Sequence, residues 1–175
     1  MGGGGISAGL LILRWTVGIV MIAHGYNHIF RGGKIEGTGR WFESLGMKPG
    51  KLHAWLASIT ELGAGALLLL GLFTPLAAAG VVSVMLVAWI TNHLHNGFFI
   101  FRPGEGWEYV MTLCMCGIAI GALGAGRWSL DYQLFASELH FEGARGLVIA
   151  AGLGGLGAAG LLLLFWRPPP RPSSE

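Results

Sequence analysis

Charged residues are scarce in this sequence. Asp, Glu, Lys and Arg make up 11% of its 175 residues, whereas soluble domains carry about 25%. The net charge is only +2, and the sequence has no basic run of the kind that binds nucleic acid. Together with 53% apolar residues and a mean hydropathy of +0.62, this composition argues against a soluble domain and against a nucleic-acid partner. It predicts a protein that is surrounded by a lipid bilayer.

Cysteines and cofactor motifs are scarce as well. The two cysteines, Cys114 and Cys116, would point about 160° apart on a helix and could not pair with each other there. Thiols buried in apolar surroundings are poorly ionised, so we expect both side chains to pack and not to react. The sequence also lacks a flavin or dinucleotide motif. An electron donor would therefore have to be a partner.

Long apolar segments and 31 glycines dominate what is present. Membrane helices accept glycine where they pack closely. The N-terminal sequence has no charged region before its apolar run, so we interpret it as part of a first membrane helix and not as a signal peptide. Five segments approach the roughly 20 residues that a bilayer requires: Ala8–Ile29, His53–Leu72, Leu76–His95, Trp107–Leu123 and Gly146–Trp166.

We therefore predict an all-α integral membrane fold. An antiparallel four-helix transmembrane bundle is expected over residues 1–131, and a linker with a fifth, C-terminal transmembrane helix over 132–166. The Pro-rich tail over 167–175 is expected to be disordered. In the first loop, a short amphipathic helix capped by Thr38 would carry an apolar stripe of Trp41, Phe42 and Leu45 that could lie on the membrane surface.

Several polar residues interrupt the apolar segments. Ionisable groups are costly in hydrocarbon, so they normally face a protein interior or a wet cavity. In an antiparallel bundle, the end of the first segment, the start of the second, the end of the third and the start of the fourth share one membrane face. We predict a cavity on that face lined by His24, His28, Glu61, Asn92, His95 and Glu108, with Asn96 close by.

These residues suggest both chemical and structural roles. Glu61, Glu108 and His95 are candidate catalytic groups for proton exchange, and His24, His28, Asn92 and Asn96 are candidates for substrate binding. The alternatives are structural. Arg14 and Glu61 could form an ion pair, because a bilayer leaves few other ways to keep either group charged, and the asparagines could join helices by hydrogen bonds.

The spacing of His24 and His28 also fits metal or haem ligands, but interfacial histidines that only form hydrogen bonds are commoner. An iron held between helices needs ligands from opposite sides, and only His95 could supply the second side. We therefore predict no metal site, no haem and no tightly bound cofactor.

The order of motifs resembles the DoxX family of small bacterial membrane proteins. After Arg14 come Ala23-His24-Gly25, then Trp41–Met47, Ile59–Gly65, His93–Phe99, Trp107-Glu108-Tyr109 and Gly126–Asp131. The resemblance covers about residues 11–131 and implies a four-helix bundle in the bacterial inner (cytoplasmic) membrane. It also implies a relation to the DoxD-type membrane subunit of thiosulfate:quinone oxidoreductase and to proteins that join membrane redox complexes. The extra C-terminal helix departs from the family pattern.

The leading functional hypothesis is a membrane subunit of a redox system. Its pocket would bind a quinone or a small sulfur or thiol substrate, and other membrane or membrane-associated redox proteins would be its partners. The rival hypothesis is a non-enzymatic scaffold or accessory subunit of a larger membrane complex. A solute carrier is disfavoured because the sequence shows no inverted repeat. The Gly-rich fifth segment offers small-residue contacts either within the chain or between copies in a homo-oligomer.

Overall fold

The computed structural model describes residues 3–135 and 142–169. Within this part of the chain the regular elements are helices joined by turns and loops, with one isolated β-bridge between Met47 and Trp166. Most of the tail predicted to be disordered, residues 170–175, lies outside the described residues. The elements, in chain order, are α1 (Gly3–Phe30), α2 (Lys34–Ser44), α3 (Gly50–Leu70), α4 (Thr74–Ala88), the π-helix η1 (Trp89–His93), α5 (Glu108–Leu123), α6 (Leu130–Phe135), α7 (Gly143–Leu147), the π-helix η2 (Val148–Leu153) and α8 (Gly154–Phe165).

Within the described residues, four helical segments are long and apolar enough to cross a membrane: Gly4–Phe30, Gly50–Leu70, Thr74–His93 and Gly143–Phe165. The predicted C-terminal transmembrane helix is among them. The predicted fourth span is present as α5, an apolar helix that is shorter than these. Length and composition therefore make the chain an all-α membrane protein.

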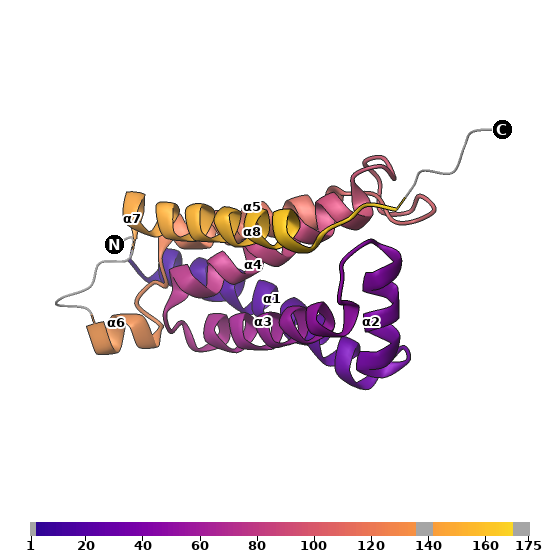
Figure 1. The fold of residues 1–175 in the computed structure, drawn as a ribbon. Helices are drawn as coiled ribbons and strands as arrows, with labels where there is room; N and C mark the ends of the chain where they lie inside the picture. Colours follow the sequence, from indigo (N-terminus) through magenta and orange to yellow (C-terminus); the bar gives the residue numbers. More distant parts are fainter. Residues whose placement is uncertain (1–2, 136–141, 170–175) are drawn as a thin grey trace.

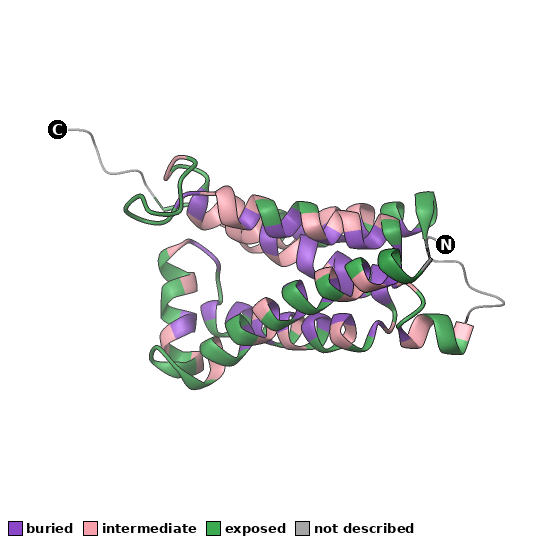
Figure 2. Ribbon diagram, turned by 180° about the vertical axis from the view of Figure 1, so that it is seen from behind, coloured by how far each residue is buried: buried purple, intermediate pink, exposed green. Residues whose placement is uncertain are grey.

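The helices pack in two groups that run side by side (Figure 1). One group is α1 on α3, and the other is α4 with α5 and the C-terminal helices, while contacts between α3 and α4 join the two. Buried residues face the inside of this arrangement, and exposed residues cover the outward sides of the helices (Figure 2). Glycine permits the closest approach: a Cβ at Gly18 of α1 would lie 2.9 Å from the carbonyl oxygen of Gly65 in α3.

The Gly-rich C-terminal helix uses part of its small-residue surface inside the chain. Gly154 packs against Val82 of α4, and Gly157 faces Ser83. Gly155 and Gly160 have open space where a Cβ would stand. A homo-oligomer through this helix stays a prediction.

Arg14 fastens the end of the bundle where α3 turns into α4. Its side chain is fully buried. Nη1 donates a hydrogen bond to the Leu68 carbonyl and Nη2 donates one to the Trp128 carbonyl, both at 2.7 Å. The Asp131 carboxylate accepts hydrogen bonds from the backbone N–H groups of Phe73 and Thr74 at 2.7 and 2.9 Å, and so caps α4.

The predicted ion pair between Arg14 and Glu61 is therefore wrong. The guanidinium lies beside Gly71, at the C-terminal end of α3, about 15 Å along the helix from Glu61. The last carbonyls of a helix lack intrahelical partners and carry partial negative charge. These carbonyls stabilise the buried cation in place of a carboxylate.

Candidate functional site

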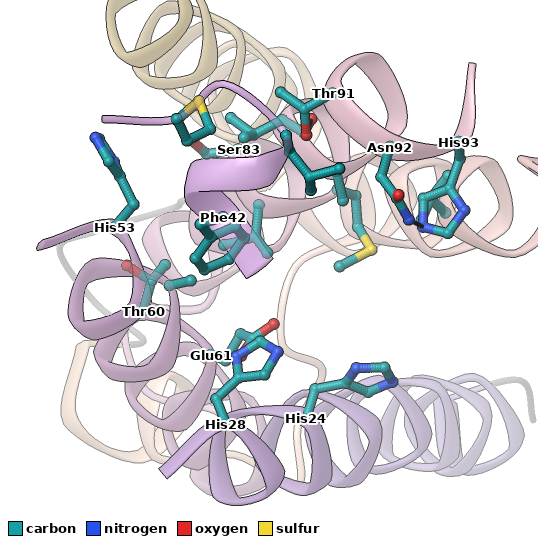
Figure 3. A pocket seen from close by; sticks show the side chains of 18 of the residues that line it. His24, His28, Phe42, His53, Thr60, Glu61, Ser83, Thr91, Asn92 and His93 are labelled. Atoms are coloured by element: carbon teal, nitrogen blue, oxygen red, sulfur yellow. Dashed lines mark hydrogen bonds and ion pairs between the residues drawn. The ribbon is translucent and has the colours of Figure 1, made fainter. Parts of the chain in front are cut away.

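A cavity of about 510 Å³ lies inside the bundle, at the end that α2 covers. Seven elements contribute to its wall: α1, α2, α3, α4, η1, α5 and α8. The wall is mostly apolar, with a few polar side chains directed toward the space (Figure 3). Both the volume and this composition are typical of small-molecule sites, which measure about 300–1,000 Å³.

Helix α2 covers this end of the cavity and stands across the ends of α1 and α3 (Figure 1). Thr38 Oγ1 donates to the His28 carbonyl at 3.1 Å, and Glu43 Oε1 accepts from the Gly50 backbone N–H at 3.1 Å. Lys51 Nζ donates to Glu36 Oε1 at 2.6 Å, and this hydrogen bond, with the lysine charge, lowers the pKa of the exposed Glu36. The first of these bonds joins α2 to α1, and the other two join α2 to the start of α3.

The apolar stripe of α2 has a different position from the expected one. Trp41, Phe42 and Leu45 all line the cavity, and Phe42 stands in the middle of the close view (Figure 3). Trp41 is also 44% exposed. The stripe therefore covers a binding space and does not only present an apolar face to lipid.

A buried histidine–carboxylate pair occupies one wall. His28 Nδ1 of α1 and Glu61 Oε2 of α3 lie 3.0 Å apart, and the two side chains are 15% and 3% exposed. Neither atom has a hydrogen-bond partner elsewhere among the described residues. The pair can form because α1 meets α3 at Gly25, where a Cβ would lie 2.9 Å from the Ser58 carbonyl oxygen. A buried carboxylate without a partner would be strongly destabilising, so the contact stabilises Glu61 inside the bundle.

The π-helix η1 supplies the opposite wall. His93 Nδ1 lies 2.8 Å from the Glu105 carbonyl oxygen, and His93 Nε2 lies 3.2 Å from Asn92 Nδ2. A carbonyl only accepts and an amide N–H only donates, so Nδ1 carries the proton and Nε2 accepts. The two contacts hold the ring of His93 in place. Single π-helical turns occur frequently at functional sites, and this one places Thr91, Asn92 and His93 along the cavity.

Four of the residues predicted from the sequence line the cavity: His24, His28, Glu61 and Asn92. His24 is exposed at the edge and stacks on Tyr109 of α5, with ring centroids 6.2 Å apart. Their proposed chemical roles stay predictions. The structure brings these side chains to one space from α1, α3 and η1.

Three predicted residues lie outside the cavity: His95, Asn96 and Glu108. His95 is exposed. Asn96 Nδ2 donates to the Asn92 carbonyl at 3.0 Å and to the loop at the Glu105 carbonyl at 3.2 Å, and Glu108 Oε1 accepts from the Ile100 N–H at 3.1 Å. The expected position of His95 and Asn96 assumed an α-helix, whereas η1 holds more residues per turn and changes the direction of those that follow.

The predicted site did not include several polar residues that line the cavity, among them His53, His93 and Tyr109. His53 is 4% exposed, its ring centroid lies 5.0 Å from that of Phe165, and Nε2 has no hydrogen-bond partner in the described part of the chain. The i, i+4, i+8 spacing of His53, Ala57 and Glu61 is the signal that places them on one side of α3. No three His, Cys, Asp or Glu side chains within residues 3–135 and 142–169 are arranged to hold a metal ion.

Apolar helices around a cavity with a buried His–Glu pair define an all-α membrane protein with an internal cavity. The DoxX family model matches residues 9–94, which include both polar walls of the cavity. The chain belongs to the DoxX family. It is also 29% identical, over 133 residues, to an uncharacterised membrane protein of Mycobacterium tuberculosis, with 71% of this chain and 80% of that protein covered. No solved structure matches the chain.

Proposed function

We propose that the cavity binds the ring of a quinone and that the protein is a membrane subunit of a redox system. The observation that carries this proposal is the pair of polar walls, His28–Glu61 on one side and Asn92–His93 on the other, across a mostly apolar space (Figure 3). A para-quinone is a flat apolar ring with a carbonyl oxygen at each end. It fits a site whose hydrogen-bonding groups lie on opposite walls.

The buried pair suits the proton part of quinone chemistry. A quinone that takes up two electrons also takes up two protons and becomes a hydroquinone. His28 and Glu61 are placed to exchange a proton with a quinone oxygen, because both side chains line the cavity and their Nδ1 and Oε2 atoms lie 3.0 Å apart. Two thiols can supply both electrons and both protons as they form a disulfide. Cys114 and Cys116 do not line the cavity, so a small thiol substrate or a partner redox protein would provide these thiols.

The proposal includes five membrane crossings in the bacterial cytoplasmic membrane. Helix α5 is about 24 Å long, shorter than a typical hydrocarbon core of about 30 Å. Helix α5 nevertheless connects the loop before it, residues 94–107, which contributes to the cavity wall, to the loop after it, residues 124–129, which lies beside Arg14. Just after the second loop, the Asp131 N–H donates to the Gly71 carbonyl at 2.8 Å. The two ends of α5 therefore lie at the two ends of the bundle, as those of a crossing helix would.

Quinone binding by the purified protein tests this proposal. Glu61→Gln and His28→Ala should each weaken the binding of a soluble benzoquinone about 10- to 100-fold, because a hydrogen bond that involves a charged group contributes about 1.5–3 kcal/mol. Asn92→Ala should weaken it less, since its amide is neutral. Glu142→Gln is the control, because it removes an exposed carboxylate outside the cavity.

The rival scaffold hypothesis gives a different result. In that case the wild-type protein binds no quinone, while Glu61→Gln and His28→Ala lower the melting temperature and the yield of inserted protein. A polar pair that only joins α1 to α3 would have this effect, and the redox proposal would then be rejected.

A further inference from the structure

Exposed residues in the wall of the cavity indicate two openings to the surface, and these differ in chemistry. His24 lines the cavity and is exposed, next to Tyr109 and near the loop that carries Glu105. On the other side, Leu56 of α3 lines the cavity and is 41% exposed. Leu161 of α8 lines it as well. One opening is therefore polar, and the other is apolar.

The apolar opening lies between α3 and α8. Helix α8 packs along α4, with Gly154 against Val82 and Gly157 beside Ser83. Its hydrogen bonds to the α2–α3 side, within the described residues, come from its last residues, Phe165–Arg167. A gap between α3 and α8 is thus bordered on one side by Leu56 and on the other by Leu161.

Residues Phe165–Arg167 close this gap at one end, and we call them the strap. The Arg167 backbone N–H donates to the Gly46 carbonyl at 2.9 Å, and the Lys48 N–H donates to the Phe165 carbonyl at 3.3 Å. Trp166 Nε1 donates to the Leu45 carbonyl at 2.9 Å. These bonds fix the end of α8 beside the cavity, so the gap has a defined border.

We propose that this gap is a port through which the hydrocarbon tail of the bound molecule passes into the bilayer. The site then takes a long-tailed, lipid-soluble quinone in preference to a small water-soluble one, and Leu56 and Leu161 determine that preference. The inference rests on the proposed function of the cavity. Leu161 lies outside the segment that matches the family model, residues 9–94, so family membership does not by itself supply this wall.

The chemistry of the two openings decides the direction of the tail. A ring held between His28–Glu61 and Asn92–His93 can extend a substituent either past His24 or past Leu56 and Leu161. An alkyl chain is driven to apolar surroundings because its exposure to water is unfavourable. It therefore leaves between α3 and α8, where Val84 and Ala57 also line the wall.

A pair of tryptophan variants tests the port. Leu161→Trp places a large ring at the border of the gap, whereas Leu163→Trp places the same ring at a position that is 77% exposed and does not line the cavity. Binding of decylplastoquinone, which has a tail, and of trimethylbenzoquinone, which has none, is measured for each protein in the same detergent. Leu161→Trp should raise the Kd of decylplastoquinone about tenfold or more and leave that of trimethylbenzoquinone within about twofold. Leu163→Trp should change neither.

Leu56→Trp provides an independent variant from the opposite border and should show the same selective loss. Equal loss of both quinones in the two border variants would overturn the port, because the tryptophan would then be displacing the ring. Unchanged binding of decylplastoquinone in both would overturn it too. A wild-type protein that binds neither quinone would instead reject the proposed function itself.

Discussion

Arg14 is wholly buried, and backbone carbonyls surround its guanidinium. The two hydrogen bonds reach two separate segments, the end of α3 at Leu68 and the loop at Trp128. Asp131, which caps α4, is the nearest source of negative charge that acts on it. At the scale of single residues, this arginine therefore holds together the end of the bundle that lies opposite the cavity.

Removing the arginine should destabilise the protein strongly. In Arg14→Met the carbonyls of Leu68 and Trp128 lose a charged donor, and a hydrogen bond to a charged group contributes about 1.5–3 kcal/mol. We expect a clear fall in melting temperature in detergent, with Arg14→Lys intermediate because a lysine cannot reproduce the planar fork of donors. Arg127→Met is the matched control, since Arg127 is exposed in the same loop region. Equal melting temperatures for Arg14→Met and Arg127→Met would contradict this role.

The sequence predicted that His24, His28 and Glu61 line the cavity, but it also placed His95 and Glu108 there, and it did not predict that His28 pairs with Glu61. The cost of charge in hydrocarbon directs His28 and Glu61 to the interior, and the cavity contains both. Their pairing depends on how far α1 is shifted along its axis relative to α3. Gly18 and Gly25 of α1 determine this shift, because they lie in close contact with α3. The segment boundaries that hydropathy predicts do not determine this axial shift, so the sequence predicted the wrong partner for Arg14.

At the scale of elements, the docking of α2 determines whether the cavity has a cover. The contact depends on two small residues, because Gly39 lies directly against the backbone of Gly50 and Lys51. A Cβ built on Gly50 would collide with the Gly39 carbonyl oxygen and with Cγ of Glu43. Helix α2 can approach α3 this closely only while both positions are glycine.

Gly50→Leu should therefore displace α2. We expect faster proteolysis between residues 31 and 48 and weaker quinone binding, because Trp41 and Phe42 would leave the cavity wall. Gly63→Leu on the same helix is the control, since a Cβ there has nothing within 4 Å. Similar proteolysis rates for these two variants would show that α2 is held by other contacts.

The π-helix η1 is an element that the sequence did not predict. The sequence Trp89–His93 continues an apolar helix without a glycine or proline, so periodicity alone predicts an α-helix up to His95. In the structure these residues form a π-helix, which is wider than an α-helix. Asn96 and Glu108 then form hydrogen bonds with the loop that follows. A change of helix type depends on tertiary contacts such as that of His93 with Glu105, which sequence reasoning does not contain.

At the scale of the whole molecule, composition and segment length predicted an all-helical membrane protein, because the bilayer requires long apolar helices. The position of the cavity was only partly predictable. Polar residues at the ends of four segments indicated the correct end of the bundle. The cover by α2 and the wall from Leu161 of α8 arise from packing between distant parts of the chain.

The last prediction concerns the number of membrane crossings. Helix α5 is shorter than the other spans, yet its two ends lie at opposite ends of the bundle, so we expect five crossings. The loop at Arg102 should then lie on the same side of the membrane as Lys34, and the loop at Arg127 on the other side with Gly4. With four crossings and α5 outside the membrane, Arg102 and Arg127 would lie on the same side.

Single-cysteine labelling distinguishes the two arrangements. In a background in which Cys114 and Cys116 are replaced by alanine, Lys34→Cys, Arg102→Cys and Arg127→Cys are each treated with a membrane-impermeant maleimide, in intact cells and after lysis. Either the Lys34 and Arg102 variants react in intact cells and the Arg127 variant reacts only after lysis, or the reverse. All three positions are exposed, so access across the membrane, and not burial, decides the outcome. Labelling of the Arg102 and Arg127 variants from the same side would exclude α5 as a crossing helix and would leave the four longer apolar segments as the only crossings within the described residues.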